Sequence, residues 1–190
     1  ENTEAVDYYV AFDNFKVGQL QGQALLDGLA ERAGHEAPYN IELFSGSPDD
    51  ANSAVFFDGA MDVLQPKIDD GTLNVVSGQT EIAQTATEGW LAENAQNRMD
   101  TILTGSYSGD TVIDGVLSPN DTLARAIITS VQQAGKPVPV VTGQDSEVES
   151  VKSIMEGVQY STINKDTTLL VAQAIKMVEQ LQKGEEVDVN

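Results

Sequence analysis

The sequence contains no cysteine and a single histidine among its 190 residues. The absence of cysteine excludes disulfide bonds, thiolate metal sites and a cysteine nucleophile. His35 lies in a polar loop, where a solvated side chain is the ordinary expectation, and a serine-histidine-aspartate triad has no other candidate. No apolar run reaches the ~18 residues of a membrane span, and no signal peptide is recognisable. These absences remove several common classes of enzyme and membrane protein.

Positive charge is also scarce. Ten Lys and Arg residues stand against 30 Asp and Glu residues, giving a formal net charge of −20. Binding to nucleic acid or to an anionic membrane requires positive charge that displaces counterions, so neither partner is expected. Hydrophobic residues make up 41% of the sequence and are spread along it, which predicts a folded domain with a sizeable core.

The sequence motifs of common enzymes and cofactor sites are missing too. The chain has no P-loop, no G-x-S-x-G elbow, no H-E-x-x-H pair, no G-x-G-x-x-G turn and no EF-hand spacing. No catalytic residue, metal ligand or cofactor is therefore predicted. Asp49 and Asp50 form a carboxylate pair, but glycosidase chemistry needs two carboxyl groups that face each other across a bond. A carbohydrate hydrolase stays an alternative that rests on fold analogy and on this pair.

Strand and helix patterns alternate along the whole chain. Runs rich in β-branched and aromatic residues predict about six strands, at 8–12, 39–44, 73–76, 112–117, 138–142 and 159–163. Stretches of helical periodicity begin near residues 15, 54, 91, 122, 147 and 167. This alternation predicts one α/β domain over residues 1–190: three layers, doubly wound, with a mostly parallel sheet and helices on both faces. Residues 184–190 are predicted to form a polar tail.

The segment Ser118–Asp121 marks the point where a predicted buried strand ends and an amphipathic helix begins. In open α/β sheets, ligands bind in the crevice beyond the carboxyl ends of the strands. Asn120 can both donate and accept hydrogen bonds, and an ionised Asp121 can only accept them, which suits a ligand rich in hydroxyl groups. The alternative is structural, because Asn and Asp are also favoured helix N-caps.

Other predicted strand ends deliver polar groups to the same edge. They are Asp13 and Asn14, Asp49, Asp50 and Asn52, Trp90 and Glu93, Gln144 and Asp145, and Asn164, Lys165 and Asp166. Amides, carboxylates and a lysine can hydrogen-bond the hydroxyls of a sugar, and Trp90 offers a flat apolar face to its ring. Each residue also has a structural alternative: Trp90 as a core residue, Lys165 as a solvated lysine, Asp145 as a helix cap.

Six segments carry a resemblance to a known family because they occur in its order. They are Phe12–Gly18, Gly46–Asn52, Val63–Pro66, Gly89–Ala95, Ser118–Asp121 and Thr142–Asp145. Through them, nearly the whole chain resembles the sugar-binding proteins of bacterial ABC importers, in particular the xylose-binding and multiple-sugar-binding branch. That family has two α/β lobes with the sugar held between them, and this sequence resembles the second lobe only.

The resemblance implies site residues, partners and a location. By matching motif positions, the ligand-binding residues would be Asn52, Trp90, Asn120, Asp145 and Lys165. The implied function is binding of a monosaccharide such as xylose or a related aldose, without catalysis or cofactor.

The implied partners are the ABC permease and the first lobe of the same protein, which lies outside this chain. The protein would be extracytoplasmic, in a periplasm or as a surface lipoprotein, and secreted through a signal peptide that also lies outside the chain. The alternative is the effector-sensing domain of a LacI-like, sugar-responsive transcription regulator, which shares this fold.

Overall fold

A computed structural model describes residues 5–187 of the chain. Its contacts divide the chain into two compact units. The main unit comprises Asn14–Asn164, and the terminal unit comprises Glu1–Asp13 together with Lys165–Asn190. Each unit is described by itself below.

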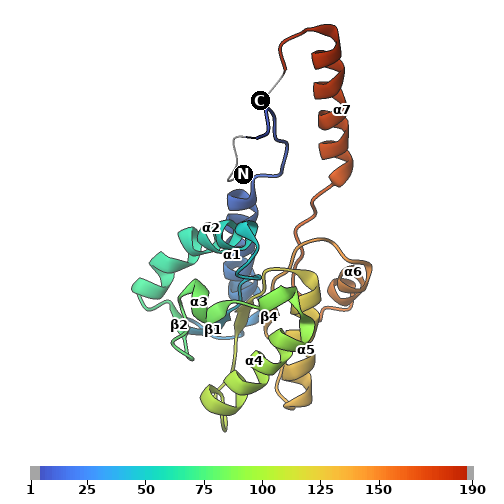
Figure 1. The fold of residues 1–190 in the computed structure, drawn as a ribbon. Helices are drawn as coiled ribbons and strands as arrows, with labels where there is room; N and C mark the ends of the chain where they lie inside the picture. Colours follow the sequence, from blue (N-terminus) through green and yellow to red (C-terminus); the bar gives the residue numbers. More distant parts are fainter. Residues whose placement is uncertain (1–4, 188–190) are drawn as a thin grey trace. The chain divides into compact units, whose positions relative to one another are not determined.

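The main unit is built on a four-stranded parallel sheet (Figure 1). Its strands are β1 (Tyr39–Leu43), β2 (Leu73–Val75), β3 (Gly115–Leu117) and β4 (Val140–Val141). They lie in the order β2-β1-β3-β4, and every neighbouring pair is parallel. The α/β class and the parallel sheet are thus confirmed, with fewer strands than predicted.

Two predicted strands do not form. Segment 159–163 runs beside the chain after β4 for only a short distance and makes one isolated bridge, between Gln144 and Ile163. Segment 8–12 has the aromatic and β-branched content of a strand but pairs with no strand within residues 5–187, and Tyr8 and Tyr9 are exposed. Strand propensity is realised only where a partner edge is available.

Helices cover both faces of the sheet, which makes three layers. Helices α1 (Asn14–Arg32) and α2 (Ala51–Asp69) share one hydrophobic core with Ile41 and Leu43 of β1. Helices α4 (Ala92–Ser106) and α5 (Asp121–Gln133) share the other core with Phe44 and Val116. Strand β3 shows the alternation directly, because Val116 faces the α4 and α5 side and Leu117 the α1 and α2 side. Shorter elements complete the unit: α3 (Ile82–Thr85), the 3-10 turn η1 (Glu88–Trp90) and α6 (Val148–Met155).

Helices α1 and α2 approach so closely that glycine is required between them. A β-carbon on Gly18 would lie 2.0 Å from the backbone oxygen of Phe56, and one on Gly59 would lie 2.1 Å from that of Phe15. Neither position has room for any side chain. This contact packs α2, which follows the loop after β1, directly against α1.

The terminal unit contains helix α7 (Thr167–Lys183). Asp166 caps its first turn by accepting from the backbone N of Thr168, and Gly184 ends it with a left-handed conformation. Met177 and Val187 are buried. Residues 188–190 of the predicted tail lie outside the described residues, and within 5–187 no helix has the length and apolarity to cross a membrane.

Candidate functional site

The carboxyl ends of the parallel strands place four of the five predicted site residues at one edge of the main unit. Asn52 follows β1 in the first turn of α2, Asn120 follows β3, and Asp145 follows β4. Because β1, β3 and β4 are neighbours in the sheet, these three segments are neighbours too. Trp90 joins them through the contacts described next. Lys165 begins the terminal unit, so its role at this edge stays a prediction.

The loop that carries Trp90 is hydrogen-bonded to the loop that follows β1. Going along the two loops, the backbone N of Ser45 donates to Thr85 O at 2.9 Å, and the backbone N of Thr87 donates to Gly46 O at 3.1 Å. The backbone N of Gly89 donates to Ser47 Oγ at 2.8 Å. The polar stretch 78–87 therefore forms α3 and a paired edge. We call these two joined segments, 45–50 and 85–90, the paired loops.

Trp90 sits at the end of the paired loops in a constrained position. Its indole Nε1 donates to Asp50 Oδ2 at 3.2 Å, and its ring packs against the backbone of Gly46, where a β-carbon would lie 2.0 Å from the ring. The side chain is half-buried and packs on the core beneath α4 and α5. Its backbone φ of +54° is uncommon for a residue with a side chain. Trp90 is thus part core residue and part accessible platform.

Asp50 and Asn52 show how structural and binding roles overlap. Asp50 caps α2 by accepting from the backbone N of Asn52 at 2.9 Å, so one of the paired carboxylates has a structural role. Its second oxygen holds Trp90. Asn52 is exposed, and its side-chain oxygen accepts from Asn14 at 2.8 Å. Its amide nitrogen makes no hydrogen bond within the part of the chain that the structure describes. Asp49 accepts from the Ser47 hydroxyl.

Asn120 is the N-cap of α5, as the structural alternative required. Its Oδ1 accepts from the backbone N of Leu123 at 2.9 Å. Only its oxygen is used in this way; within residues 5–187 its side-chain nitrogen makes no hydrogen bond. The residue is half-buried at the edge of the sheet. Asn120 can therefore cap the helix and still donate to a ligand.

Asp121 has a different role from its neighbour Asn120 because it is fully buried. Its carboxylate accepts from the backbone N of Glu147 at 2.9 Å, from Gln159 Nε2 at 2.9 Å and from Thr162 Oγ1 at 2.9 Å. Burial raises the pKa of this carboxyl, while the three donors act to lower it. Asp121 thus joins the loop after β4 to segment 159–162 and is not presented to a ligand.

Asp145 lies beside this buried carboxylate and is itself exposed. Its backbone is left-handed, with φ of +95°. The preceding Gln144 donates from Nε2 to Pro119 O at 2.6 Å, and Gln144 O accepts from the backbone N of Asp121 at 3.0 Å. The loops after β3 and β4 are thereby fixed to each other. Asn120 and Asp145 are consequently carried on one connected piece of structure.

A second buried polar cluster escaped the sequence interpretation. Glu42 in β1 is fully buried and accepts from Tyr107 Oη at 2.9 Å and from the backbone N and hydroxyl of Ser77, at 3.0 and 2.5 Å. Burial raises the pKa of Glu42 and lowers that of Arg98 to about 10. Arg98 donates to the backbone oxygen of Leu43 at 2.8 Å. The cluster fixes the chain after β2, which leads on to Trp90. No sequence pattern indicated this cluster, because Glu42 is a single acidic residue within an alternating strand pattern.

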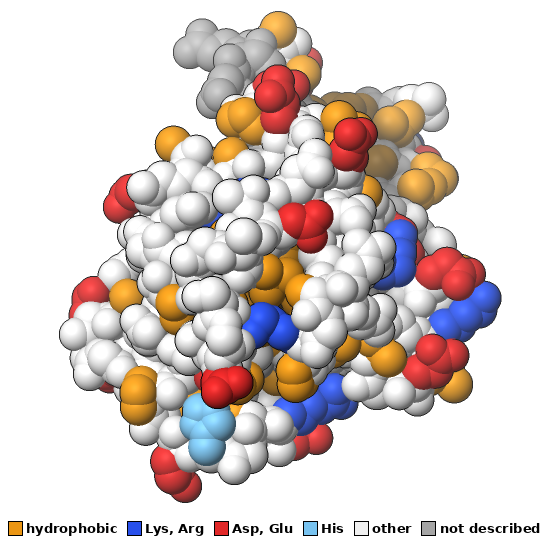
Figure 2. Space-filling view, turned by 90° about the horizontal axis from the view of Figure 1, so that it is seen from below, with side chains coloured by type: hydrophobic (Ala, Val, Ile, Leu, Met, Phe, Trp, Pro, Cys, Tyr) orange, Lys and Arg blue, Asp and Glu red, His pale blue; other side chains and the backbone are white. Residues whose placement is uncertain are grey.

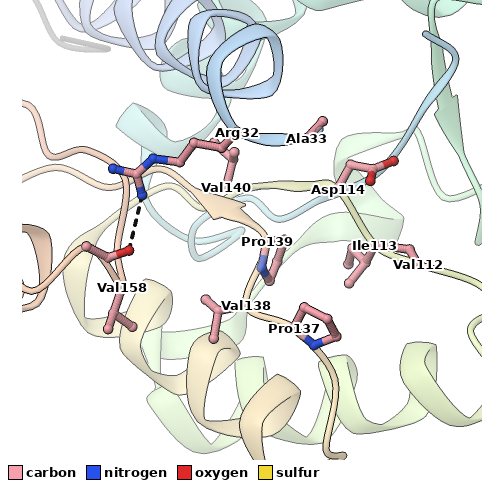
Figure 3. Close-up of a pocket in the computed structure, with 11 residues that line it drawn as sticks. Arg32, Ala33, Val112, Ile113, Asp114, Pro137, Val138, Pro139, Val140 and Val158 are labelled. Atoms are coloured by element: carbon pink, nitrogen blue, oxygen red, sulfur yellow. Dashed lines mark hydrogen bonds between the residues drawn. The ribbon is translucent and has the colours of Figure 1, made fainter. Parts of the chain in front are cut away.

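A cavity of about 280 Å³ lies at the opposite edge, beside the amino ends of β3 and β4 (Figure 3). Valine and proline side chains line most of it, and the Arg32 guanidinium at its margin donates to Gly157 O at 3.2 Å. Figure 2 shows apolar side chains in a hollow on one face of the molecule. His35 Nε2 lies 3.0 Å from Asp114 Oδ1. None of the five predicted ligand residues lines this cavity.

The fold and its polar carboxyl edge define an α/β module of the kind that binds small ligands beyond its strands. Comparison with known proteins specifies the family. Residues 1–186 match the periplasmic binding protein domain, and the chain belongs to that family. The family resemblance expected from the six segments is confirmed.

Among curated relatives, the multiple sugar-binding periplasmic receptor ChvE of Rhizobium radiobacter is 48% identical over 99% of this chain and 54% of the receptor. The D-xylose-binding periplasmic protein of Escherichia coli (strain K12) is 36% identical over 97% of this chain and 52% of that protein. The chain therefore spans about half the length of these relatives.

Solved structures agree with this placement. An ABC transporter solute-binding protein from Clostridium phytofermentans with bound β-D-glucose matches with a TM-score of 0.89 and 41% identity, over 100% of this chain and 58% of that one. A carbohydrate transporter solute-binding protein from Chloroflexus aurantiacus, in complex with D-glucose, matches with a TM-score of 0.84 and 34% identity, over 99% and 59%.

Proposed function

We propose that residues 1–190 form the second lobe of a sugar-binding, extracytoplasmic receptor of a bacterial ABC importer. The observation that carries the proposal is the carboxyl edge itself, where Asn52, Trp90, Asn120 and Asp145 gather on neighbouring segments. The names of the relatives support a sugar as ligand. A monosaccharide such as xylose, glucose or a related aldose fits a site with three polar side chains and one aromatic platform.

In this proposal each residue has a distinct task. The Asn120 amide nitrogen donates to a sugar hydroxyl, and the Asp145 carboxylate accepts from one. Asn52 contributes a further polar contact, and the exposed part of Trp90 packs on the C–H face of the ring. Lys165 is a further proposed donor, and this role rests on the family resemblance alone. No bond is made or broken, so the protein is a binder and not an enzyme.

The mechanism is closure of two lobes around the sugar. The first lobe supplies the other half of the contacts, and the liganded closed form is favoured because the sugar touches both lobes only in that form. The closed form then docks on the membrane permease. Such a receptor works outside the cytoplasm, in a periplasm or as a surface lipoprotein, after secretion through a signal peptide.

The alternatives gain nothing from the structure. A glycosidase would need both Asp49 and Asp50 to face a substrate. Asp50 instead caps α2 and accepts from the Trp90 indole, and Asp49 accepts from the Ser47 hydroxyl. The transcription-regulator alternative has no support among the relatives described above, which are named as periplasmic sugar-binding and solute-binding proteins.

Calorimetric titration of the full-length two-lobe protein with pentoses and hexoses tests the proposal. Asn120→Asp keeps an oxygen that caps α5 but loses the amide donor, so sugar affinity should fall about tenfold or more while the melting temperature stays unchanged. Asn97→Asp, at an exposed position of α4, is the matched control and should bind as wild type does. Absence of binding to every sugar would refute the proposal.

A further inference from the structure

Asp145 and Ser146 both have left-handed backbone conformations, with φ of +95° and +51°. Residues with a β-carbon rarely adopt this region, and two in succession persist only where surrounding contacts hold them there. The direction of the Asp145 side chain therefore depends on whatever holds this turn.

Three consecutive backbone N–H groups of the turn are each held by a group from another segment. The backbone N of Asp145 donates to Ile163 O at 3.0 Å, and that of Ser146 donates to Thr162 Oγ1 at 3.1 Å. The backbone N of Glu147 donates to Asp121 Oδ2 at 2.9 Å. Two of the three acceptors belong to residues 162–163, so this short segment acts as a clamp on the turn.

The hydroxyl of Thr162 has a fixed orientation within this clamp. It donates its hydrogen to Asp121 Oδ2 at 2.9 Å, which leaves its oxygen lone pairs for the Ser146 N–H. Asp121 is itself immobilised, because Gln159 Nε2 donates to its other oxygen at 2.9 Å. A β-carbon on Gly143 would lie 2.2 Å from that oxygen, so the carboxylate packs directly on the backbone of Gly143.

We propose that Thr162 is a positioning residue for the ligand site: its hydroxyl holds Ser146, and through it the strained backbone that aims Asp145. The proposal rests on the proposed function, in which Asp145 hydrogen-bonds the sugar. Thr162 itself makes no contact with the ligand in this scheme. Position 162 therefore sets affinity through the geometry of Asp145 alone.

Sugar affinity of the full-length protein, measured by calorimetry, tests this scheme. Thr162→Val removes the hydroxyl with little change in shape and should weaken binding about tenfold, while Thr162→Ser keeps the hydroxyl and should bind as wild type does. Adding Ser146→Gly to Thr162→Val should restore most of the affinity, because glycine adopts positive φ without help. In an Asp145→Ala background, Thr162→Val should have no further effect on affinity.

Each contrary result is decisive. Wild-type affinity in Thr162→Val, or an equal loss in the presence and absence of Asp145, would overturn the positioning role. If Thr162→Val does not fold, Ser146→Pro gives a second test, since proline forces φ to about −65° and removes the N–H. Ser146→Pro should lose affinity as Asp145→Ala does, and wild-type binding by it would overturn the proposal. A wild-type protein that binds no sugar refutes the proposed function instead, so the two failures are distinguishable.

Discussion

Substituting Gly46 by alanine should dislodge Trp90. The added β-carbon would lie 2.0 and 2.1 Å from two ring carbons of Trp90, whereas ordinary contacts begin at 3.4 Å. The ring would have to move by roughly 1.4 Å, because the closest obstacle to the new carbon is the indole itself. Such a shift would break the 3.2 Å hydrogen bond from Nε1 to Asp50 Oδ2.

The cost follows from two effects. Overpacking of this kind typically costs about 1–3 kcal/mol, and the lost hydrogen bond adds about 0.5–1.5 kcal/mol. We therefore expect Gly46→Ala to lower the free energy of unfolding of the 190-residue chain by about 1.5–4.5 kcal/mol, measured by urea denaturation. Trp90 is the only tryptophan in the sequence, so its emission should shift to longer wavelength as the ring moves toward water.

Gly105→Ala provides the matched control. Gly105 lies inside α4, and a β-carbon there would meet no atom within 4 Å. Alanine at this position should be neutral or stabilise the protein by up to about 1 kcal/mol, because it restricts the unfolded chain. Unchanged stability and unchanged emission in Gly46→Ala would show that the ring does not rest on Gly46, and the account of the paired loops would be wrong.

Two further predictions concern His35 and Gly143. The hydrogen bond that His35 Nε2 donates to the Asp114 carboxylate raises the pKa of His35, so the pair's stabilising contribution is present below about pH 6.5 and is lost as pH rises through the raised value. The melting-temperature difference between wild type and His35→Gln should accordingly be larger at pH 5.5 than at pH 9, and a pH-independent difference would count against the pair. Gly143→Ala should cost at least about 1–3 kcal/mol in urea denaturation, because its β-carbon would lie 2.2 Å from Asp121 Oδ1; an unaltered midpoint would contradict that close approach.

Periodicity predicted the larger elements of the fold well. The apolar spacing of α1 and α5 gave their positions within a residue or two, because a buried helical face leaves a regular record in the sequence. The segment at 8–12 was misassigned for a physical reason. A strand needs a partner edge as well as suitable residues, and local sequence carries no information about that edge.

The sequence predicted which segments meet at the carboxyl edge of the sheet, but not the separate roles of the residues on them. The strand-end rule placed Asn120 and Asp121 together at the carboxyl edge, but it could not assign them different roles. Asn120 faces outward as a cap, whereas Asp121 is buried by Gln159 and Thr162, which lie about 40 residues further along the chain. The role of Trp90 could not be predicted from local sequence either, because its hydrogen bond to Asp50 forms only where the two paired loops meet.

Two separate sets of contacts hold the candidate site in place, one around Trp90 and one around Asp145. The paired loops hold Trp90 against Gly46 and Asp50, whereas the network around Asp121 and Thr162 holds the backbone at Asp145. These contacts have no residue in common, although both networks lie at the ends of neighbouring strands. An aromatic platform and a carboxylate need different kinds of support: the first needs close packing on a bare backbone, the second a turn held by directed hydrogen bonds. A parallel sheet supplies both because each strand end carries its own loop, so each proposed ligand contact has its own local support.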